Sequence, residues 1–304
     1  MHDLQFYFDA MAQDDLIYWF VPIFLVALAL ELLLDWKQKL HLFRREDTIA
    51  SLWMMVFVVV VDQLPKFAAL VAFYYLHSIS PLADVVQRQW WAWIVLFFLD
   101  DITYYFMHRA NHEVRLFWAG HVSHHSAIKM NFATALRQGV FERVHKYLFW
   151  LPLPLLGFDP LMIFTMMSLN LFYQFWLHTE LVRRLPRWFE AVFNTPSHHR
   201  VHHGSNIRYL DCNHAGVLII WDRLFGTFSQ EVDEDPVIYG LTDNLASLKP
   251  VHVATHEYSA IFRDVKRAER LGDKLSYLLK APGWSHDGVD KRAKVLRAQL
   301  AAET

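Results

Sequence analysis

Histidines are the residues of this sequence whose number and spacing could do chemistry. The chain of 304 residues contains 18 of them, and most of those in its middle part fall into tight groups. Segment 108–112 reads HRANH, and segments 121–125 and 199–203 each carry the pattern HxxHH, while His178 stands at the end of an apolar stretch. Residues three and four apart share one face of a helix, so each group can direct two or three imidazoles at one point.

A convergence of imidazoles on this scale is typical of a metal site. The neutral imidazole nitrogen binds zinc, iron, copper or nickel, and a site built from it alone needs no cysteine. The chain has one cysteine, Cys212, which excludes disulfides within the chain, four-cysteine zinc sites and iron–sulfur clusters. A cluster without metal would bury many unsatisfied or mutually repelling imidazoles. The pattern therefore predicts a shared site with enough donors for two metal ions.

Other common motifs are missing from the sequence. A zinc protease needs HExxH, but His112 and Glu113 are followed by Leu116 where the second histidine should stand. Soluble di-iron bundles need two ExxH pairs, and Glu142 with His145 provides only one, which we expect to cap or brace a helix. The ten glycines form no GxGxxG and no P-loop, and a net charge of −2 without a basic block excludes a nucleic-acid partner.

The elements that must position these histidines are long and apolar. Hydrophobic residues make up 54% of the chain and aromatic residues 16%, which is more than is usual for a soluble domain. Residues 17–34 form an apolar run long enough to cross a bilayer, and their acidic N-terminal flank argues against a signal peptide. Further spans are predicted near 49–76, 90–107 and 147–177. The second is interrupted by polar residues and proline, and the last resembles a hairpin that re-enters the bilayer.

Basic residues predict how the chain crosses the membrane. They follow the first and third spans: Lys37, Lys39, Arg44, Arg45, Arg109, Arg115 and Lys129. Because basic flanks stay in the cytoplasm, the N-terminus is expected outside. Residues 108–146 and everything after 178 are expected on the cytoplasmic side, where all the histidine groups follow apolar helices and can converge.

The prediction for the fold is a single all-α integral membrane domain, residues 1–304, with about four spans, one of them kinked or re-entrant. Its histidine cluster occupies 108–125 and 178–214. Residues 229–304 are charged and much less apolar, and we expect them to form a cytoplasmic helical cap.

The order of the histidine groups resembles that of the fatty acid hydroxylase and sterol desaturase superfamily of membrane di-iron oxygenases. The flanking segments carry the likeness: DDITYYFMHR, WAGHVSHHSA, NFATALRQ, FWLHTELV, NTPSHHRVHHGSN and GVLIIWDRLFGTF. They look like the bacterial members and, within the superfamily, the alkylglycerol monooxygenase-like members. VIYGL near 237 and LLKAPGWS near 278 extend the likeness over roughly residues 90–288.

The resemblance implies a set of metal ligands and of residues that support them. The implied ligands are His108, His112, His121, His124, His125, His178, His199, His202 and His203, with His198 as a candidate tenth. Asp101 matches an acidic position of the family that can orient an imidazole, and Glu113, Asp222 and His214 are further candidates for supporting positions.

The resemblance also implies the reaction and its participants. They are two iron ions, with zinc as a substitute in purified protein, O2, and a membrane lipid that is hydroxylated, with alkylglycerol ether lipids as candidates. Electrons must come from a separate donor, either tetrahydrobiopterin or a ferredoxin or cytochrome, because the chain has no redox cofactor signature. A sterol or fatty-acyl desaturase with the same centre is the nearest alternative, and a metal or proton transporter is the alternative of another class. The likeness to bacterial members implies a location in the bacterial inner membrane.

Overall fold

The computed structural model describes residues 2–14 and 16–303 and is built from helices. Across those residues, β pairing is confined to two isolated bridges, Phe193 with Leu218 and Gly204 with Tyr239. The prediction of an all-α fold is therefore confirmed.

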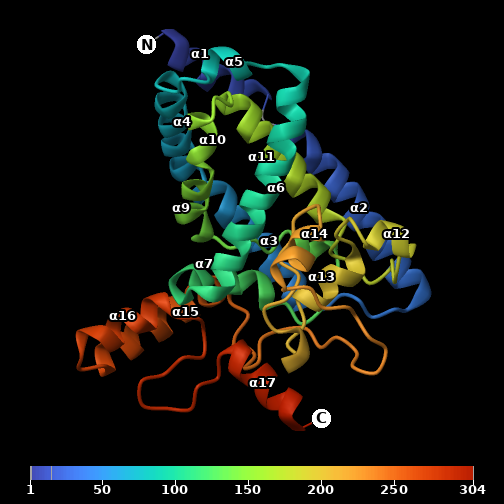
Figure 1. Cartoon of the computed structure of the whole chain (residues 1–304). Helices are drawn as coiled ribbons and strands as arrows, with labels where there is room; N and C mark the ends of the chain where they lie inside the picture. Colours follow the sequence, from blue (N-terminus) through green and yellow to red (C-terminus); the bar gives the residue numbers. More distant parts are fainter. Residues whose placement is uncertain (1, 15, 304) are drawn as a thin grey trace.

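Long helices form an elongated bundle that extends from the N-terminal end to the middle of the molecule (Figure 1). They are α2 (Leu16–Gln38), α3 (Arg45–Val61), α4 (Gln63–Ser78), α6 (Trp90–Glu113) and α11 (Pro160–Phe175). Shorter helices cover the N-terminal end of the bundle and connect its members. They are α1 (His2–Asp14), α5 (Ala83–Val86), α8 (Phe132–Ala135), α9 (Glu142–Lys146), η1 (Tyr147–Trp150) and α10 (Pro152–Leu155).

The remaining helices lie at the other end of the bundle (Figure 1). They are α7 (Arg115–His125), α12 (Arg187–Glu190), α13 (Pro196–His202), η2 (Ile207–Tyr209), α14 (Ile220–Phe225), α15 (Pro250–Arg267), α16 (Leu271–Leu279) and α17 (Ala293–Glu303). Arg115 attaches the C-terminal helices to α7, because its guanidinium donates to Glu257 and to Asp264, each at 2.7 Å. The C-terminal helices therefore form a cap on the end of the molecule that carries α7.

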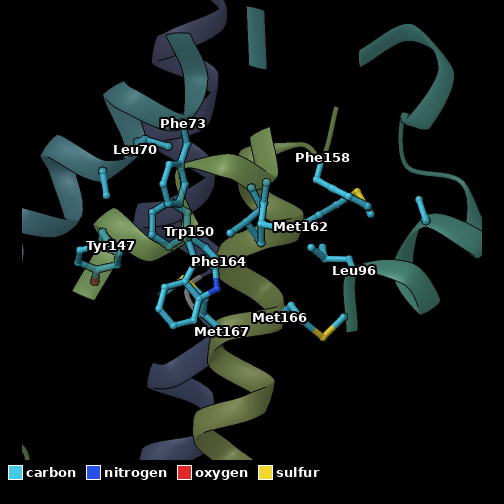
Figure 2. Close-up of a cluster of buried hydrophobic side chains, with 14 of the residues drawn as sticks. Leu70, Phe73, Leu96, Tyr147, Trp150, Phe158, Met162, Phe164, Met166 and Met167 are labelled. Atoms are coloured by element: carbon cyan, nitrogen blue, oxygen red, sulfur yellow. The ribbon is translucent and has the colours of Figure 1, made fainter. Parts of the chain in front are cut away.

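An aromatic and methionine-rich core holds the bundle together. Figure 2 shows Phe73 of α4, Trp150 of η1, and Met162 and Phe164 of α11 gathered in one cluster. The Phe73 and Phe164 rings lie 5.3 Å apart. Trp150 is 1% exposed and donates its indole N–H to Asp100 of α6 at 2.7 Å. Burying apolar surface of this size is the main source of stability for the bundle.

The outer faces of the same helices are apolar as well. Trp19, Val60, Leu64 and Trp90 are between 67% and 75% exposed, although a soluble protein rarely exposes apolar patches that extend along several helices. Within the described residues, Trp19–Gln38 is the one helix long and apolar enough to cross a bilayer by itself. The pair α3 and α4 gives a second candidate if it counts as one bent span. The structure thus contains one or two such candidates where the sequence predicted about four spans.

The predicted interruptions appear as breaks between helices. α3 and α4 are bent by 42° at Asp62, which precedes Pro65 in the first turn of α4. The predicted span 147–177 is divided into η1, α10 and α11, and at the break Gly157 has a φ of +90° that favours glycine. α11 is only 16 residues long and α6 falls short of the composition required of a span, which is why the count is lower than predicted.

Candidate metal centre

The break between α6 and α7 at Val114 brings the first histidines together. His108 and His112 lie on the last turns of α6, and His121, His124 and His125 on the last turns of α7. Val114 is extended, with φ −120° and ψ 113°, so α7 starts in a new direction directly after α6 ends.

The other histidines come from the second half of the chain. His178 lies just beyond α11, and His199 and His202 lie on α13, whose first residue is Pro196. Proline suits the first turn of a helix because its missing N–H would have no partner there. His203 follows as the C-cap of α13.

The nine histidines implied by the resemblance lie in two groups. Within each group, one ring nitrogen from every residue lies within 4.8 Å of those of all the others. Group 1 contains His108, His112, His121, His125 and His202. Group 2 contains His124, His178, His199 and His203. All nine are buried, and the groups adjoin, because the ring centres of His125 and His203 lie 4.5 Å apart. The arrangement can hold two metal ions.

Two carboxylates orient imidazoles of group 1. Glu142 accepts from Nδ1 of His121 at 2.7 Å, and Asp211 accepts from Nδ1 of His112 at 3.2 Å. Burial raises the pKa of Glu142, but His121 and Arg143 outweigh that effect and hold this pKa well below its usual range. The carboxylate therefore keeps its charge, and it fixes Nδ1 as the protonated nitrogen of the ring it faces.

Backbone carbonyls orient other members of group 1 in the same way. Nδ1 of His108 lies 2.8 Å from the carbonyl oxygen of His214, and Nδ1 of His202 lies 2.9 Å from that of Cys212. A carbonyl oxygen can only accept, so Nδ1 carries the proton in both rings and Nε2 carries a lone pair.

In group 2, two rings have a hydrogen-bonded Nδ1, and in both the acceptor is a backbone carbonyl oxygen. Nδ1 of His124 donates to Arg137 O at 2.9 Å, and Nδ1 of His178 donates to Gln174 O at 3.0 Å. Nδ1 of His199 is buried and finds no partner in the described part of the chain. The Nε2 atoms of this group also face one another.

The Nε2 atoms of several rings face one another at short distance, and a metal ion between them would accept their lone pairs. Nε2 of His108 lies 3.0 Å from Nε2 of His121, and Nε2 of His124 lies 3.3 Å from Nε2 of His178. Since Nδ1 carries the proton in all four rings, each contact brings two lone pairs together, and no hydrogen bond can form. Two further Nε2 atoms, those of His112 and His202, are buried without a partner among the described residues. The donors therefore fit metal ions with a preference for imidazole nitrogen.

Burial keeps these imidazoles in the ligating form. It lowers the pKa of His108, His124, His125, His199, His202 and His203 well below the usual value, and the neighbouring histidines add to the effect. Burial also lowers the pKa of His178 to about 4. Neutral rings at physiological pH are the form that binds metal.

Two glycines permit the approach of Glu142 to His121. A Cβ on Gly120 would lie 2.9 Å from the backbone nitrogen of Glu142, and a Cβ on Gly139 would collide with the carbonyl oxygen of Gly120. Any side chain at either position would push α7 and α9 apart and lengthen the bond between imidazole and carboxylate.

The acidic candidates from the sequence do not contact an imidazole. Asp101 accepts from the backbone of Val217 and Leu218 and from the indole of Trp221. It therefore anchors the loop after the last histidine group, and does not orient a ligand as expected. Glu113 is half exposed and pairs with Arg109 at 2.8 Å.

Asp222 supports the histidines indirectly, through the backbone segment that contacts one of them. It accepts from the backbone N–H groups of His214 and Ala215, each at 2.8 Å, and so holds the segment whose carbonyl receives His108. The ring of His214 is fully buried, outside both groups, with a ring centre 5.0 Å from that of His112. His198, the candidate tenth ligand, also lies outside both groups, and its ring contacts Phe228 edge to face.

The sequence patterns did not identify the two carboxylates that contact imidazoles of group 1. Glu142 is half of an ExxH pair in the sequence, but its partner is His121 and not His145, whose Nε2 instead bonds Asn111 at 2.8 Å. Asp211 has a φ of +52°, which no sequence pattern signalled.

Two cavities reach the centre from different sides. One has a volume of about 420 Å³, touches His121, His124 and His178, and is lined mainly by α2, α3, α9 and α11; we call it the chamber. The other has a volume of about 310 Å³, touches His112 and His125, and is lined by α7, by α13 and by loops and helices of the cap. The centre is thus reached from two different sides.

Comparison with known proteins gives the family. The model of the fatty acid hydroxylase family matches residues 93–227. The alkylglycerol monooxygenase of Xenopus tropicalis is 37% identical over 261 residues, which is 86% of this chain and 58% of the relative. That of Danio rerio is 38% identical over 265 residues (87% and 58%), and that of Homo sapiens 37% identical over 265 residues (86% and 58%).

The chain spans 58% of the length of these relatives. No solved structure matches it. The family match covers the segment from α6 to α14, which contains every histidine of both groups. On this similarity and on its histidine groups, the chain belongs to the fatty acid hydroxylase family.

Proposed function

We propose that this protein is an O2-dependent hydroxylase of a membrane lipid that holds two iron ions in its two histidine groups. The observation that carries the proposal is the convergence of nine imidazole nitrogens in adjoining groups of five and four. Iron is the metal implied by the family, and zinc binds such donors too, so zinc in purified protein would not contradict the assignment.

The bound metal would supply the activation of O2 needed to oxidise an unactivated C–H bond. The chain's own residues position that chemistry and isolate it. Glu142 and Asp211 hold His121 and His112 in one tautomer and one orientation. The chamber, whose walls include Phe24 of α2, brings a hydrocarbon chain to the centre in surroundings poor in water.

An alkylglycerol ether is the substrate we favour. Hydroxylation of the ether carbon inserts one oxygen atom of O2, and the second leaves as water with two electrons and two protons from an external reductant. The product is a hemiacetal, which separates into a fatty aldehyde and glycerol without further catalysis. Similarity to alkylglycerol monooxygenases over 86% of the chain supports this choice.

The reductant is an external donor, either a reduced pterin such as tetrahydrobiopterin or a ferredoxin or cytochrome. The cavity on the cap side offers such a donor a route to His112 and His125 that does not cross the chamber.

We also propose that the chain is an inner-membrane protein with about four spans and with its histidine centre on the cytoplasmic face. The exposed apolar faces of α2, α3, α4 and α6 support this arrangement. Cys212 is buried and cannot report topology, so the test uses cysteines introduced at two exposed positions, Asp84→Cys and Glu269→Cys. In intact spheroplasts a membrane-impermeant maleimide should label the first and not the second. Labelling of the second from outside would overturn the orientation.

The test of the function is incubation of purified protein with an alkylglycerol ether, 18O2 and either a reduced pterin or a ferredoxin system. The proposal expects fatty aldehyde whose release requires O2 and His125, and glycerol as the co-product. Oxidation of sterol or acyl lipids with the ether untouched would remove the ether-cleaving assignment and favour the alternative hydroxylase or desaturase. No oxidation of any lipid by protein that contains both irons would contradict the proposal itself.

A further inference from the structure

One short helix at the chamber, α9, has the reverse of the usual amphipathic pattern. Its polar residues Glu142, Arg143 and Lys146 are between 5% and 9% exposed, while Val144 in the same helix is 64% exposed. A charged side chain is expensive to bury beside hydrocarbon and is retained there for function more often than for stability. The inward face of α9, with Gln138 just before it, forms a polar wall of the chamber.

The guanidinium of Arg143 is not saturated by the protein. One of its terminal nitrogens donates to Gln138 at 3.2 Å, but its Nε is buried and has no partner in the described part of the chain. Among the described residues, neither Arg143 nor Lys146 has a carboxylate oxygen within 4.0 Å. Lys146 lies above the Trp150 ring, with its ammonium 5.9 Å from the ring centre.

The carboxylates nearest to these cations are engaged elsewhere. Glu142 binds His121, Asp100 accepts from Trp150 and Asn170, and Asp62 accepts from the hydroxyl of Tyr147. A purely structural ion network would pair these carboxylates with the cations directly. The donors of Arg143 and Lys146 are instead left to line the chamber.

The other helices around the chamber contribute mainly apolar side chains. They are Phe24 of α2, Met55 and Val58 of α3, and Leu171 and Phe175 of α11, beside the amides of Asn170 and Gln174. The chamber thus combines an apolar lining, the hydrogen-bond donors of α9 and the histidine centre. That combination suits an amphiphile whose polar and apolar parts both enter.

On the basis of the proposed function, we propose that Arg143 and Lys146 bind the oxygen atoms of the lipid head group and so determine which carbon is oxidised. Arg143 is the residue after Glu142, which bonds the ligand His121, so a head group held there lies beside the centre. The carbon presented for oxidation is then among the first of the chain. Hydroxyl and phosphate oxygens share the chemistry these donors recognise.

The test measures binding and needs no turnover. Dissociation constants are determined for metal-loaded protein without reductant, using three probes of equal chain length: an alkylglycerol ether, its phosphate and the plain alkane. The variants are Lys146→Met, which keeps the volume, and Arg143→Lys, which keeps the charge. Lys294→Met on the exposed face of α17 is the matched control.

We expect Lys146→Met and Arg143→Lys each to raise the dissociation constants of the ether and of the phosphate roughly tenfold or more. This is the loss of affinity expected when a hydrogen bond from a charged donor is removed. The alkane should bind with an unchanged constant, and the control should bind all three probes like the parent. If the variants lose more affinity for the phosphate than for the ether, the residues recognise an anionic head group. If they lose the same affinity for both probes, the residues recognise hydroxyl groups.

Equal affinities of parent and both variants for the two polar probes would overturn the inference and leave the polar wall a structural feature. This outcome is separable from failure of the proposed function, because binding is measured whether or not any lipid is oxidised. Metal content and thermal unfolding of each variant show whether it is folded. In wild-type protein, products oxidised only at mid-chain carbons would also contradict the inference.

Discussion

The two histidine groups adjoin one another, but the chain supports them differently. Group 1 has five imidazoles, and two of them donate Nδ1–H to the carboxylates of Glu142 and Asp211. Group 2 has four imidazoles, and its two hydrogen-bonded Nδ1 atoms donate only to backbone carbonyls. Carboxylate partners make an imidazole more basic than carbonyl partners do. The comparison teaches that the two metal positions are unequal: group 1 should hold its ion more tightly, and group 2 should leave more coordination positions to other reactants.

The largest effect should come from removing one ligand of either group. We expect His121→Ala and His199→Ala each to lower lipid oxidation by about a thousandfold or more, because oxidation needs both ions. Product formation per chain by mass spectrometry measures this effect, with His252→Ala as the control, since His252 is exposed on the cap. Near-normal turnover in either ligand variant would show that one group suffices.

Removing a carboxylate partner should separate the two groups. Glu142→Gln and Asp211→Asn should weaken metal binding at group 1 by about 10- to 100-fold, the loss usual for partners of ligating histidines, with binding at group 2 unchanged. Titration with a competing chelator, read as two steps of metal release, measures both affinities. If both metal affinities fell equally, the two groups would not differ as described.

Acid should destabilise the metal-free protein through the buried neutral histidines. The pKa of His178 is lowered by burial to about 4, while an unfolded histidine titrates near 6.5. Between these values the unfolded chain binds more protons, so the free energy of unfolding falls as the pH falls, by up to about 1.4 kcal/mol per pH unit for this group. Thermal or chemical unfolding of chelated protein should show a shallower slope for His178→Asn. An unchanged slope would mean that His178 is already protonated in the folded state.

The smallest effect is expected at Glu113. This carboxylate follows a ligand of group 1 in the sequence, but it is half exposed and pairs with Arg109. Exposed pairs of this kind contribute about 0.3–0.5 kcal/mol. Glu113→Gln should therefore leave metal content unchanged and shift stability only within that range. Loss of the group 1 ion in this variant would place Glu113 among the residues that support the site.

Sequence patterns predicted the helical class and the histidines that converge, because spacing along a helix fixes which side chains share a face. The HxxHH segments lie on α7 and at α13 as the pattern indicates. The bend at Asp62 and the break near Gly157 were also predictable from the sequence, because polar residues, proline and glycine interrupt the apolar runs at these points.

Contacts between distant segments could not be predicted in this way. Glu142 reaches His121 only because Gly120 and Gly139 let two segments approach closely. Asp101 has the right residue type and position for a partner of histidine, yet it bonds the backbone at 217 and 218. Which donor an acidic group meets depends on tertiary packing, about which local spacing carries no information.

The most direct test of the central claim is the metal content per chain of purified protein and of one ligand variant from each group. Inductively coupled plasma mass spectrometry should find two first-row metal ions per wild-type chain, and one in each of His121→Ala and His199→Ala, with folding confirmed by thermal unfolding. A wild-type chain that holds no more than one ion under saturating iron, or a variant that keeps both, would contradict two separate sites built from the two histidine groups.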